Sequence, residues 1–324
     1  IDTSSNVEKS TIKNIASFLN KLKEFEKFRA KKLTISEIQE NKYKVQNEIC
    51  DWVRKVEKNK DSTLRGFFNV INTCIFNFNK LNNTNYSTFN HDENKYKKEI
   101  KEIIYLTEDE LTNLYKFVYS PTDKMIEMAR PSERDMVCLK NFLFRCFSGM
   151  RISEMNNSNI SRNSVINQIE RIAIDKKKET YRHSGFTYYA GKENKEVTVP
   201  YIGNHLFFIA NDLNFQFPNF ETDSELINYQ VREKDIVASV LNSIYGGDIR
   251  KVKITAGKRT TEFPLSKKIT THTARKTFAY LIYNHKKDIM YVRQCLGHAK
   301  LETTLSYLGI KYTNQEYENI MLDL

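Results

Sequence analysis

The sequence has no long hydrophobic run and little glycine or proline, with 10 and 5 of these residues among 324. A membrane-spanning helix needs about 18 or more consecutive apolar residues, so an ordinary transmembrane segment is excluded, and the start of the chain is too polar for a secretory signal. Abundant lysine, glutamate, isoleucine and leucine favour helices over flexible linkers. We therefore expect a soluble, intracellular and mainly helical protein.

The cysteines lack a pattern as well. They number five and include neither a CxxC pair nor a histidine-rich spacing, so the sequence indicates no disulfide framework and no zinc site. The first residue is Ile1 rather than methionine, which indicates a fragment or a processed product. We expect buried, reduced thiols at Cys50, Cys74, Cys138, Cys146 and Cys295.

Acidic residues are too few to balance the basic ones. The chain has 51 Lys and Arg against 40 Asp and Glu, which gives a formal net charge of +11 and a pI near 9.2. This balance favours a polyanionic partner. Nucleic acid is the first candidate and an acidic membrane surface is the second.

The first part of the chain has apolar residues at helical spacing in three successive segments. Residues 82–102 are polar and rich in Asn and Lys, which is typical of a linker. We predict a helical bundle over residues 1–81 and a second domain over 103–324 with a tail at 309–324. The predicted buried stripes are Ile12, Ile15, Leu19, Leu22 and Phe25, then Val45, Ile49, Trp52, Val53 and Val56, then Phe68, Ile71, Ile75 and Phe78.

The second domain opens with a helix signal. Thr107-Glu108-Asp109-Glu110 has the form of a capping box, and Leu111, Leu114 and Phe117 follow as predicted buried positions. From about residue 166 to 202 the pattern shifts to alternation, and the turn-like GKENKE stands between GFTYYA and VTVPY. We predict a small antiparallel sheet inside a mainly helical domain.

The stretch LGHAKLETTLSY places His298 nine residues before Tyr307. On one straight helix these two side chains would lie on opposite faces, so they can meet only if the chain turns between them. Gly297 permits a turn, and Leu301, Leu305 and Leu308 predict a new helix. Alternatively, His298 caps a helix end and Tyr307 packs its ring.

Three further segments carry candidate residues, each ambiguous alone. In THTARKTFAYLI, Thr271 is the predicted N-cap, and His272 and Arg275 share the first turn of a helix whose dipole favours a phosphate. They could equally form a surface pair above the buried stripe of Ala274, Phe278 and Ile282. Arg151 in SGMRISEM could instead pair with Glu154. Lys192 in AGKENKEVTVP could simply solubilise a turn.

The order of these segments is more specific than any one of them. Arg151, Lys192, the His272-x-x-Arg275 pair, His298 and Tyr307 stand in SGMRISEM, GKENKEVTVPY, HTARKTFA and LGHAKLETTLSYLG. The set resembles the tyrosine recombinases, or phage-type integrases, whose segments read TGLRISEL, GKGNKERxVPL, HxLRHxFA and LGHxxxxTTxxYxH. The likeness covers about residues 103–312, and the helical first part resembles the core-binding domain of integrases from conjugative transposons.

The resemblance implies a role for each residue. Tyr307 is the nucleophile, Arg151 and Arg275 hold the scissile phosphate, and His272 and His298 complete the site. Lys192 protonates the leaving 5′ oxygen, with Lys195 as a competing candidate. The chain departs from the family pattern at Lys276 and at Leu308-Gly309, and neither departure touches an implied role.

Such a protein forms a reversible 3′-phosphotyrosine link and needs no metal or cofactor. The resemblance implies a double-stranded DNA recombination site as partner, a homotetramer on DNA that is monomeric in solution, and a bacterial cytoplasmic, nucleoid-associated location away from membranes. The tail after Tyr307 docks either on a neighbouring protomer or on its own core. Integration, excision, inversion and dimer resolution stay open as outcomes, and the alternative functions are a type IB topoisomerase-like enzyme and a non-catalytic DNA-binding regulator.

Overall fold

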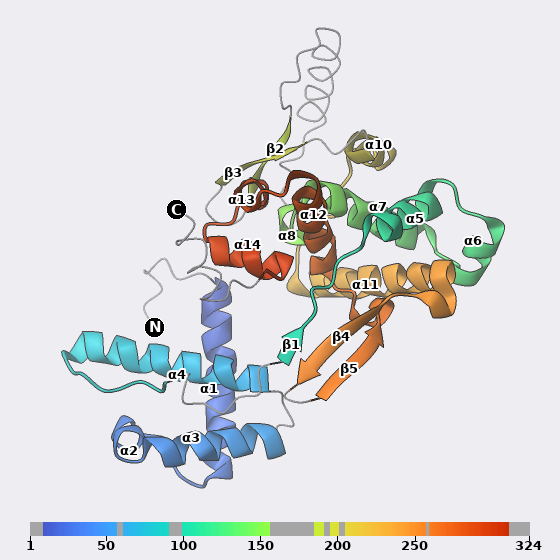
Figure 1. Cartoon of the computed structure of the whole chain (residues 1–324). Coiled ribbons are helices and arrows are strands. Elements are labelled where there is room, and N and C mark those ends of the chain that lie inside the picture. The colour runs from blue at the N-terminus through green and yellow to red at the C-terminus, as the bar shows by residue number, and fades with distance from the viewer. Residues whose placement is uncertain are drawn as a thin grey trace, which may run out of the picture. The chain divides into compact units, whose positions relative to one another are not determined.

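The computed structural model describes residues 9–56, 61–90, 99–155, 185–190, 195–200, 205–256 and 259–310. Helices dominate these ranges, and two small sheets accompany them (Figure 1). The predicted fold class, mainly helical with a small antiparallel sheet, is confirmed. None of the helices within the described ranges combines the length and the apolar character that crossing a membrane requires.

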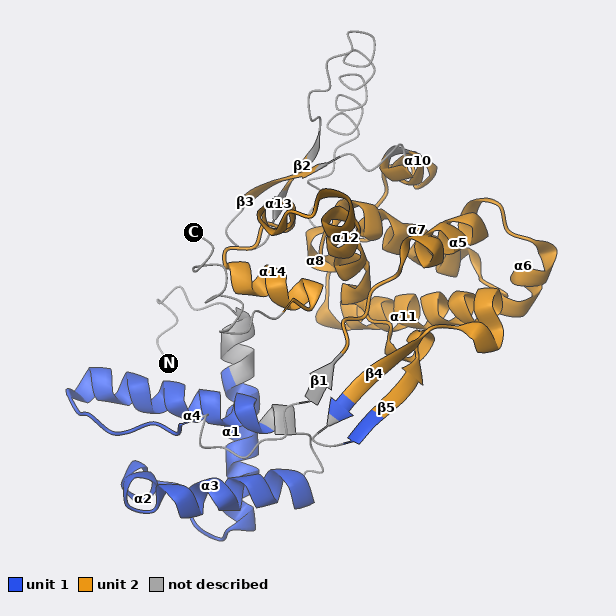
Figure 2. Ribbon diagram, in the orientation of Figure 1, with its two compact units in different colours: residues 1–100, 255–260 blue, residues 101–254, 261–324 orange. Residues whose placement is uncertain are grey.

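The chain divides into two compact units (Figure 2). Unit 1 comprises Ile1–Ile100 and Thr255–Thr260, and unit 2 comprises Lys101–Ile254 and Thr261–Leu324. Each unit has its own hydrophobic core. The boundaries predicted from the sequence stay predictions.

Aromatic side chains build the core of unit 1. The indole of Trp52 packs on Phe25 and Phe67, with ring centroids 5.4 and 5.7 Å away. These rings come from helices that are distant in sequence, so their burial holds the helices together. The elements are α1 (Lys9–Phe28), α2 (Ile35–Glu40), α3 (Lys42–Asp51), the π-helical turn η1 (Trp52–Val56) and α4 (Asp61–Asn82).

Leu19, Val56 and Phe78 were predicted to be buried and are exposed instead. In α1, Phe18 takes the buried position because its ring packs on Phe67 at 4.9 Å, and the next residue therefore faces outward. The π-helical turn η1 adds a residue to each turn, which rotates Val56 off the buried face. Phe78 lies past the last buried residue of α4.

The cysteines are free thiols with unequal exposure. Cys138, Cys146 and Cys295 are buried as predicted, and Cys50 is partly exposed. The prediction was wrong for Cys74, which is exposed because it lies outside the stripe by which α4 contacts the core.

Part of the expected linker packs on unit 1. The ring of Phe89 is buried against Phe68, with ring centroids 5.0 Å apart. The side-chain amide of Asn72 satisfies the backbone of Phe89 twice, because it donates to the carbonyl and accepts from the N–H, each at 2.8 Å. Asn79 holds the backbone of Tyr86 in the same way, at 2.9 Å to each group, so this polar segment is part of the structured unit.

The remaining elements begin at residue 99. They are β1 (Glu99–Lys101), α5 (Glu108–Tyr119), α6 (Asp123–Ala129), α7 (Glu133–Ser148), α8 (Ile152–Met155), β2 (Gly185–Ala190), β3 (Lys195–Pro200), α10 (His205–Asp212), α11 (Asp223–Tyr245), η2 (Gly246–Asp248), β4 (Lys251–Ala256), β5 (Arg259–Pro264), η3 (Leu265–Lys268), α12 (Thr271–Lys286), α13 (Ile289–Leu296) and α14 (Leu301–Leu308).

Helix α7 lies at the centre of unit 2, where it packs against α10, α11 and α12. Its second half, from Asn141 to Ser148, is buried on all sides. The predicted capping box at the start of α5 is confirmed, since Thr107 and Glu110 bond to one another's backbone N–H groups. The residues predicted to be buried in α5, namely Leu111, Leu114 and Phe117, are buried.

The described residues also form two small sheets. The predicted hairpin is confirmed as strands β2 and β3, which pair antiparallel with Tyr188 opposite Val197. A second sheet, in the order β1-β4-β5, was not predicted. The strand β4, KVKITA, does alternate polar and apolar residues, a signal that the sequence reasoning missed, whereas β5, RTTEFP, is largely polar.

Candidate functional site

Arg275 joins three segments of unit 2. Its guanidinium is buried and donates from Nη1 to the carbonyl oxygen of Gly149 at 2.5 Å and from Nη2 to that of Leu296. The carboxylate of Glu154 lies 3.6 Å from Nη1. Because Gly149 precedes Arg151 and Leu296 precedes His298, one arginine on α12 anchors the turns that carry two other candidate residues.

Helix α12 holds His272 and Arg275 in its first turn, as predicted. Its N-cap is Thr270 and not Thr271, so that prediction was wrong by one residue. The backbone N–H of Thr270 donates to Thr273 Oγ1 at 3.0 Å, which closes a capping box that the pattern at Thr271 did not reveal. The predicted buried stripe of Ala274, Phe278 and Ile282 is confirmed.

Arg151 stands at a sharp turn between α7 and α8. Gly149 makes this turn with φ +68°, and a Cβ there would lie only 2.5 Å from the ring of Phe278, so the position requires glycine. Arg151 pairs with Glu154, which was the alternative reading of this segment. About a third of its side chain is exposed, while Glu154 is buried. The buried carboxylate of Glu154 therefore interacts with both Arg151 and Arg275.

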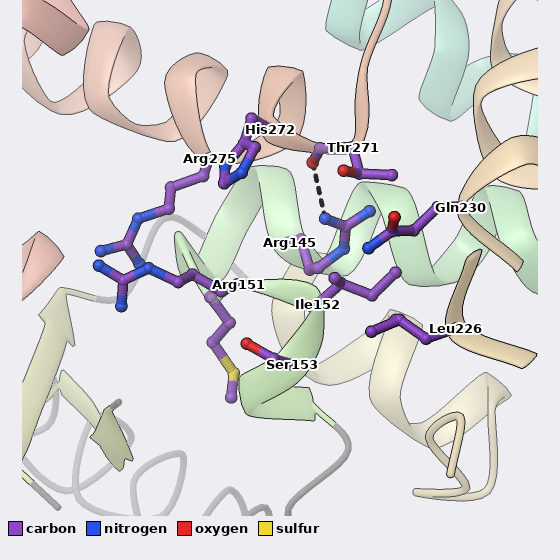
Figure 3. A pocket seen from close by; sticks show the side chains of 10 residues that line it. Arg145, Arg151, Ile152, Ser153, Leu226, Gln230, Thr271, His272 and Arg275 are labelled. Atoms are coloured by element: carbon purple, nitrogen blue, oxygen red, sulfur yellow. Dashed lines mark hydrogen bonds between the residues drawn. The ribbon is translucent and has the colours of Figure 1, made fainter. Parts of the chain in front are cut away.

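A pocket of about 260 Å³ opens between these elements, and Arg151, His272 and Arg275 form part of its wall (Figure 3). Figure 3 shows the guanidinium groups of Arg151 and Arg275 side by side at one end. Ser153 and Gln230 add uncharged polar groups to the lining. Two adjacent guanidinium groups in a concave site are suited to an anion with several oxygens.

His298 and Tyr307 lie on different segments, as predicted. Helix α13 ends before Gly297, whose φ of 61° turns the chain, and Tyr307 is on α14. The two rings meet edge to face with centroids 5.0 Å apart. The imidazole of His298 is 5% exposed, and its Nδ1 lies 3.0 Å from Thr304 Oγ1. Its Nε2 has no hydrogen-bond partner in the described part of the protein.

Both histidines are held neutral. Burial lowers the pKa of His298 to about 3, and the charges of Arg275 and Arg151 add to this effect. Burial likewise lowers the pKa of His272, followed by the charges of Lys276 and Arg275. Near neutral pH each imidazole is therefore uncharged and can accept a hydrogen bond at one nitrogen and donate one from the other.

The predicted lysine is the one candidate that the structure does not place. Lys192 lies outside the described residues, and Lys195 is the first residue of β3. The hairpin itself is close to the arginines, because Tyr188 on β2 interacts with Arg275. Burial raises the pKa of Tyr188 to about 12, while Arg275 opposes that rise.

Two charged residues beside the pocket were missed by the sequence reasoning. Arg145 on α7 lines the pocket and is paired with Glu233 on α11, and both side chains are 1% exposed. The available signal was an arginine inside FLFRCF, a stretch that is otherwise apolar. A charged residue among core residues on a buried helix requires a partner.

Comparison with known proteins shows that this chain is similar to integrases and recombinases. The sequence profile described as the phage integrase family matches residues 104–314. The probable integrase/recombinase YoeC of Bacillus subtilis (strain 168) is 45% identical over 42 residues, which are 13% of this chain and 23% of that protein. The match therefore spans less than a quarter of this relative's length.

Solved structures share the fold at low sequence identity. The Tn1549 transposon integrase, in complex with transposon right end DNA, is 12% identical with a TM-score of 0.59 over 99% of this chain and 95% of that chain. A lambda integrase dimer bound to a COC′ core site is 11% identical with a TM-score of 0.54 over 96% and 93%. Both likenesses concern the fold.

Proposed function

We propose that this chain, which belongs to the phage integrase family of tyrosine recombinases, cleaves and rejoins DNA strands through a covalent bond between Tyr307 and a 3′-phosphate. The observation that carries the proposal is the grouping of two arginines and a neutral histidine around one pocket, with a second neutral histidine against the Tyr307 ring. Each of these residues lies within the matched range of the family.

The scissile phosphate would bind at the arginine end of the pocket. Attack on a phosphodiester builds negative charge on its nonbridging oxygens, and fixed guanidinium groups stabilise that charge without reorganising. An arginine side chain has five N–H donors. The bonds of Arg275 to Gly149 and Leu296 use two of them and leave the others for a ligand. His272, neutral and on the same helical turn, adds an N–H donor.

The nucleophile would be the Tyr307 hydroxyl. An ordinary phenol has a pKa of about 10 and is a weak nucleophile at neutral pH, so attack requires a proton acceptor. The neutral His298 imidazole next to the Tyr307 ring supplies one. The Tyr307 oxygen forms a bond to phosphorus, the bond from phosphorus to the 5′ oxygen breaks, and the hairpin lysine, Lys192 or Lys195, protonates that oxygen.

The product would retain a phosphodiester, so a free 5′-hydroxyl can reverse the step without an external energy source. Rejoining to a strand from another duplex is recombination. A net charge of +11 favours binding to duplex DNA. Exchange between two duplexes requires four active sites, and we propose a homotetramer assembled on DNA that integrates, excises or inverts a mobile element.

The test is covalent capture on DNA. Nicked duplexes tiled across the DNA that flanks the gene are incubated with the full chain, and adducts that survive detergent are detected on a gel. Wild-type protein should form one adduct at a defined site, and Tyr307→Phe should abolish it because the ring stays and only the nucleophile is lost. Tyr291→Phe, on the neighbouring helix α13, serves as the matched control and should retain the adduct.

Outcomes separate the alternatives. Resolution of Holliday junctions supports a recombinase, whereas relaxation of supercoils without strand exchange supports a topoisomerase-like enzyme. Specific DNA binding with no adduct on any duplex would point to a non-catalytic regulator and reject the proposal.

A further inference from the structure

Arg145 and Glu233 form an ion pair that is shut off from solvent. Their side chains are each 1% exposed, and they join α7 to α11 across 88 residues of sequence. Burying two charges carries a desolvation cost that apolar residues of similar volume would avoid, so overall stability is a weak reason for such a pair. The pair is therefore expected to serve a specific geometry.

That geometry is the start of α12. Nη1 of Arg145 donates to the carbonyl oxygen of Thr271 at 2.8 Å (Figure 3). Nη2 of Arg145 contacts Glu233. Thr271 is the first residue of α12, directly before His272 and four residues before Arg275. In an α-helix this carbonyl also accepts the N–H of the residue four positions later, so a bond to it fixes the turn from which both side chains project.

Glu233 completes the arrangement. A guanidinium is planar, and holding one of its terminal nitrogens determines the direction of the other. Burial raises the pKa of the Glu233 carboxyl, and the adjacent Arg145 opposes that rise. The contact of Nη2 with Glu233 sets the plane of the guanidinium, which directs Nη1 toward the carbonyl oxygen of Thr271.

Arg145 lines the pocket but is committed to these two partners and buried. We propose that Arg145, oriented by Glu233, is a positioning residue that sets the first turn of α12 so that His272 and Arg275 meet the phosphate. The inference rests on the proposed function, since it assigns a further residue to the same pocket.

The decisive variant is the double substitution Arg145→Met/Glu233→Met. It removes both charges together, so no unpaired buried charge is left to unfold the protein. Arg145→Lys is its conservative counterpart, because an ammonium keeps the charge beside Glu233 but lacks the fork that reaches Thr271. Lys140→Met/Asp212→Met is the matched control, since it removes a partly exposed pair, 2.7 Å apart, that also involves α7.

The first measurement separates DNA affinity from the rate of cleavage. Single-turnover formation of the covalent adduct should slow about a hundredfold in the double variant and about tenfold in Arg145→Lys, as expected for a displacement of the reacting groups by about 1 Å. Affinity for the duplex should stay within about threefold of wild type, because most of it comes from other phosphates. The control pair should leave both unchanged.

The second measurement needs no DNA. Inorganic phosphate is titrated into the full chain while the ring signals of His272 are followed by NMR, and the double variant should bind phosphate about tenfold more weakly than wild type. If wild type forms no adduct but this loss is seen, the proposed function fails and the positioning role stands.

A folded double variant with wild-type cleavage and wild-type phosphate affinity overturns the inference. If the double variant does not fold, Arg145→Lys decides in the same way, since unchanged cleavage and phosphate affinity in that variant also overturn it. A wild-type protein that neither cleaves DNA nor binds phosphate overturns it too, because no anion site would be there to position.

Discussion

Individual residues in this protein combine structural and chemical tasks. Arg275 closes two turns by bonding to the carbonyl groups of Gly149 and Leu296, yet it borders the pocket where the phosphate is proposed to bind. Glu154 pairs with Arg151 and lies near Arg275. Since these charges are shared between fold and site, substitutions at either arginine should affect stability as well as chemistry.

The buried imidazole of His298 makes stability depend on pH. Its pKa is about 3 in the folded protein, against about 6.5 when unfolded, so between these values the unfolded chain binds a proton that the folded chain does not. The contribution of His298 to the free energy of unfolding is thus fully present above about pH 6.5. It falls as pH drops toward 3, by up to about 1.4 kcal/mol per pH unit.

Urea unfolding measured from pH 7 to pH 4 checks this expectation. His298→Asn should flatten the decline because the variant lacks the titrating ring. His285→Asn, which alters an exposed histidine on α12, should retain the wild-type slope. Equal slopes in wild type and His298→Asn would contradict the assignment.

At the level of elements, the turn between α13 and α14 brings His298 to Tyr307. Gly297 adopts a left-handed conformation, and the chain then starts α14 at Leu301. Across this turn the hydroxyl of Thr304 bonds to Nδ1 of His298, which fixes the ring against the helix. The orientation of the proposed proton acceptor therefore depends on a residue of α14 that has no chemical role of its own.

Thr304→Val tests that dependence with almost no change in volume. Thr304 is buried, so loss of the hydroxyl leaves the imidazole nitrogen unpaired and should lower the free energy of unfolding by about 1–3 kcal/mol. The rate of adduct formation should fall as well. Thr303→Val, the exposed neighbour on the same helix, should change stability by less than about 0.5 kcal/mol in urea unfolding. Similar losses in both variants would assign the effect to α14 itself.

At the scale of the whole molecule, charge dominates the expected interaction with DNA. The net charge of +11 belongs to a chain of two compact units, and unit 2 contains the pocket. Binding that neutralises phosphates releases counterions, so affinity falls as salt rises. Contacts with the bases would add a preference for particular DNA sequences to this non-specific electrostatic affinity.

Affinity for duplex DNA should drop about a thousandfold between 50 and 200 mM salt if roughly six or more phosphates are contacted. Fluorescence anisotropy over that range gives the slope of log Kd against log salt. Arg151→Gln should reduce the slope by about one unit, because it removes one phosphate contact. The charge-neutral Lys140→Met/Asp212→Met pair should not alter it. Affinity that is insensitive to salt would argue against an electrostatic DNA partner.

Several features of fold and site could be read directly from local sequence. The capping box at Thr107, the hairpin around GKENKE, the turn at Gly297 and the position of His272 and Arg275 in one helical turn were all predicted correctly. The order of the motifs also identified the family, which the profile match over residues 104–314 confirms. The capping box, the turn at Gly297 and the shared helical turn depend on spacing within about ten residues, where helix period and turn chemistry operate.

Tertiary packing decided the rest. Phe18 rather than Leu19 is buried because Phe67 lies beside it, and Phe89 is anchored by Asn72 although its neighbours are polar. The pairing of Arg145 with Glu233 has no local signature for its partner, because the two residues are 88 positions apart.

Three residues of the pocket, Arg151, His272 and Arg275, were proposed from the sequence, but Arg145 and the contacts that hold these side chains were not. Arg275 reaches Gly149 across 126 positions, and the distance between such residues is set by how helices pack. Local pattern specifies which residues a segment offers, while the burial of those segments against one another determines which residues meet.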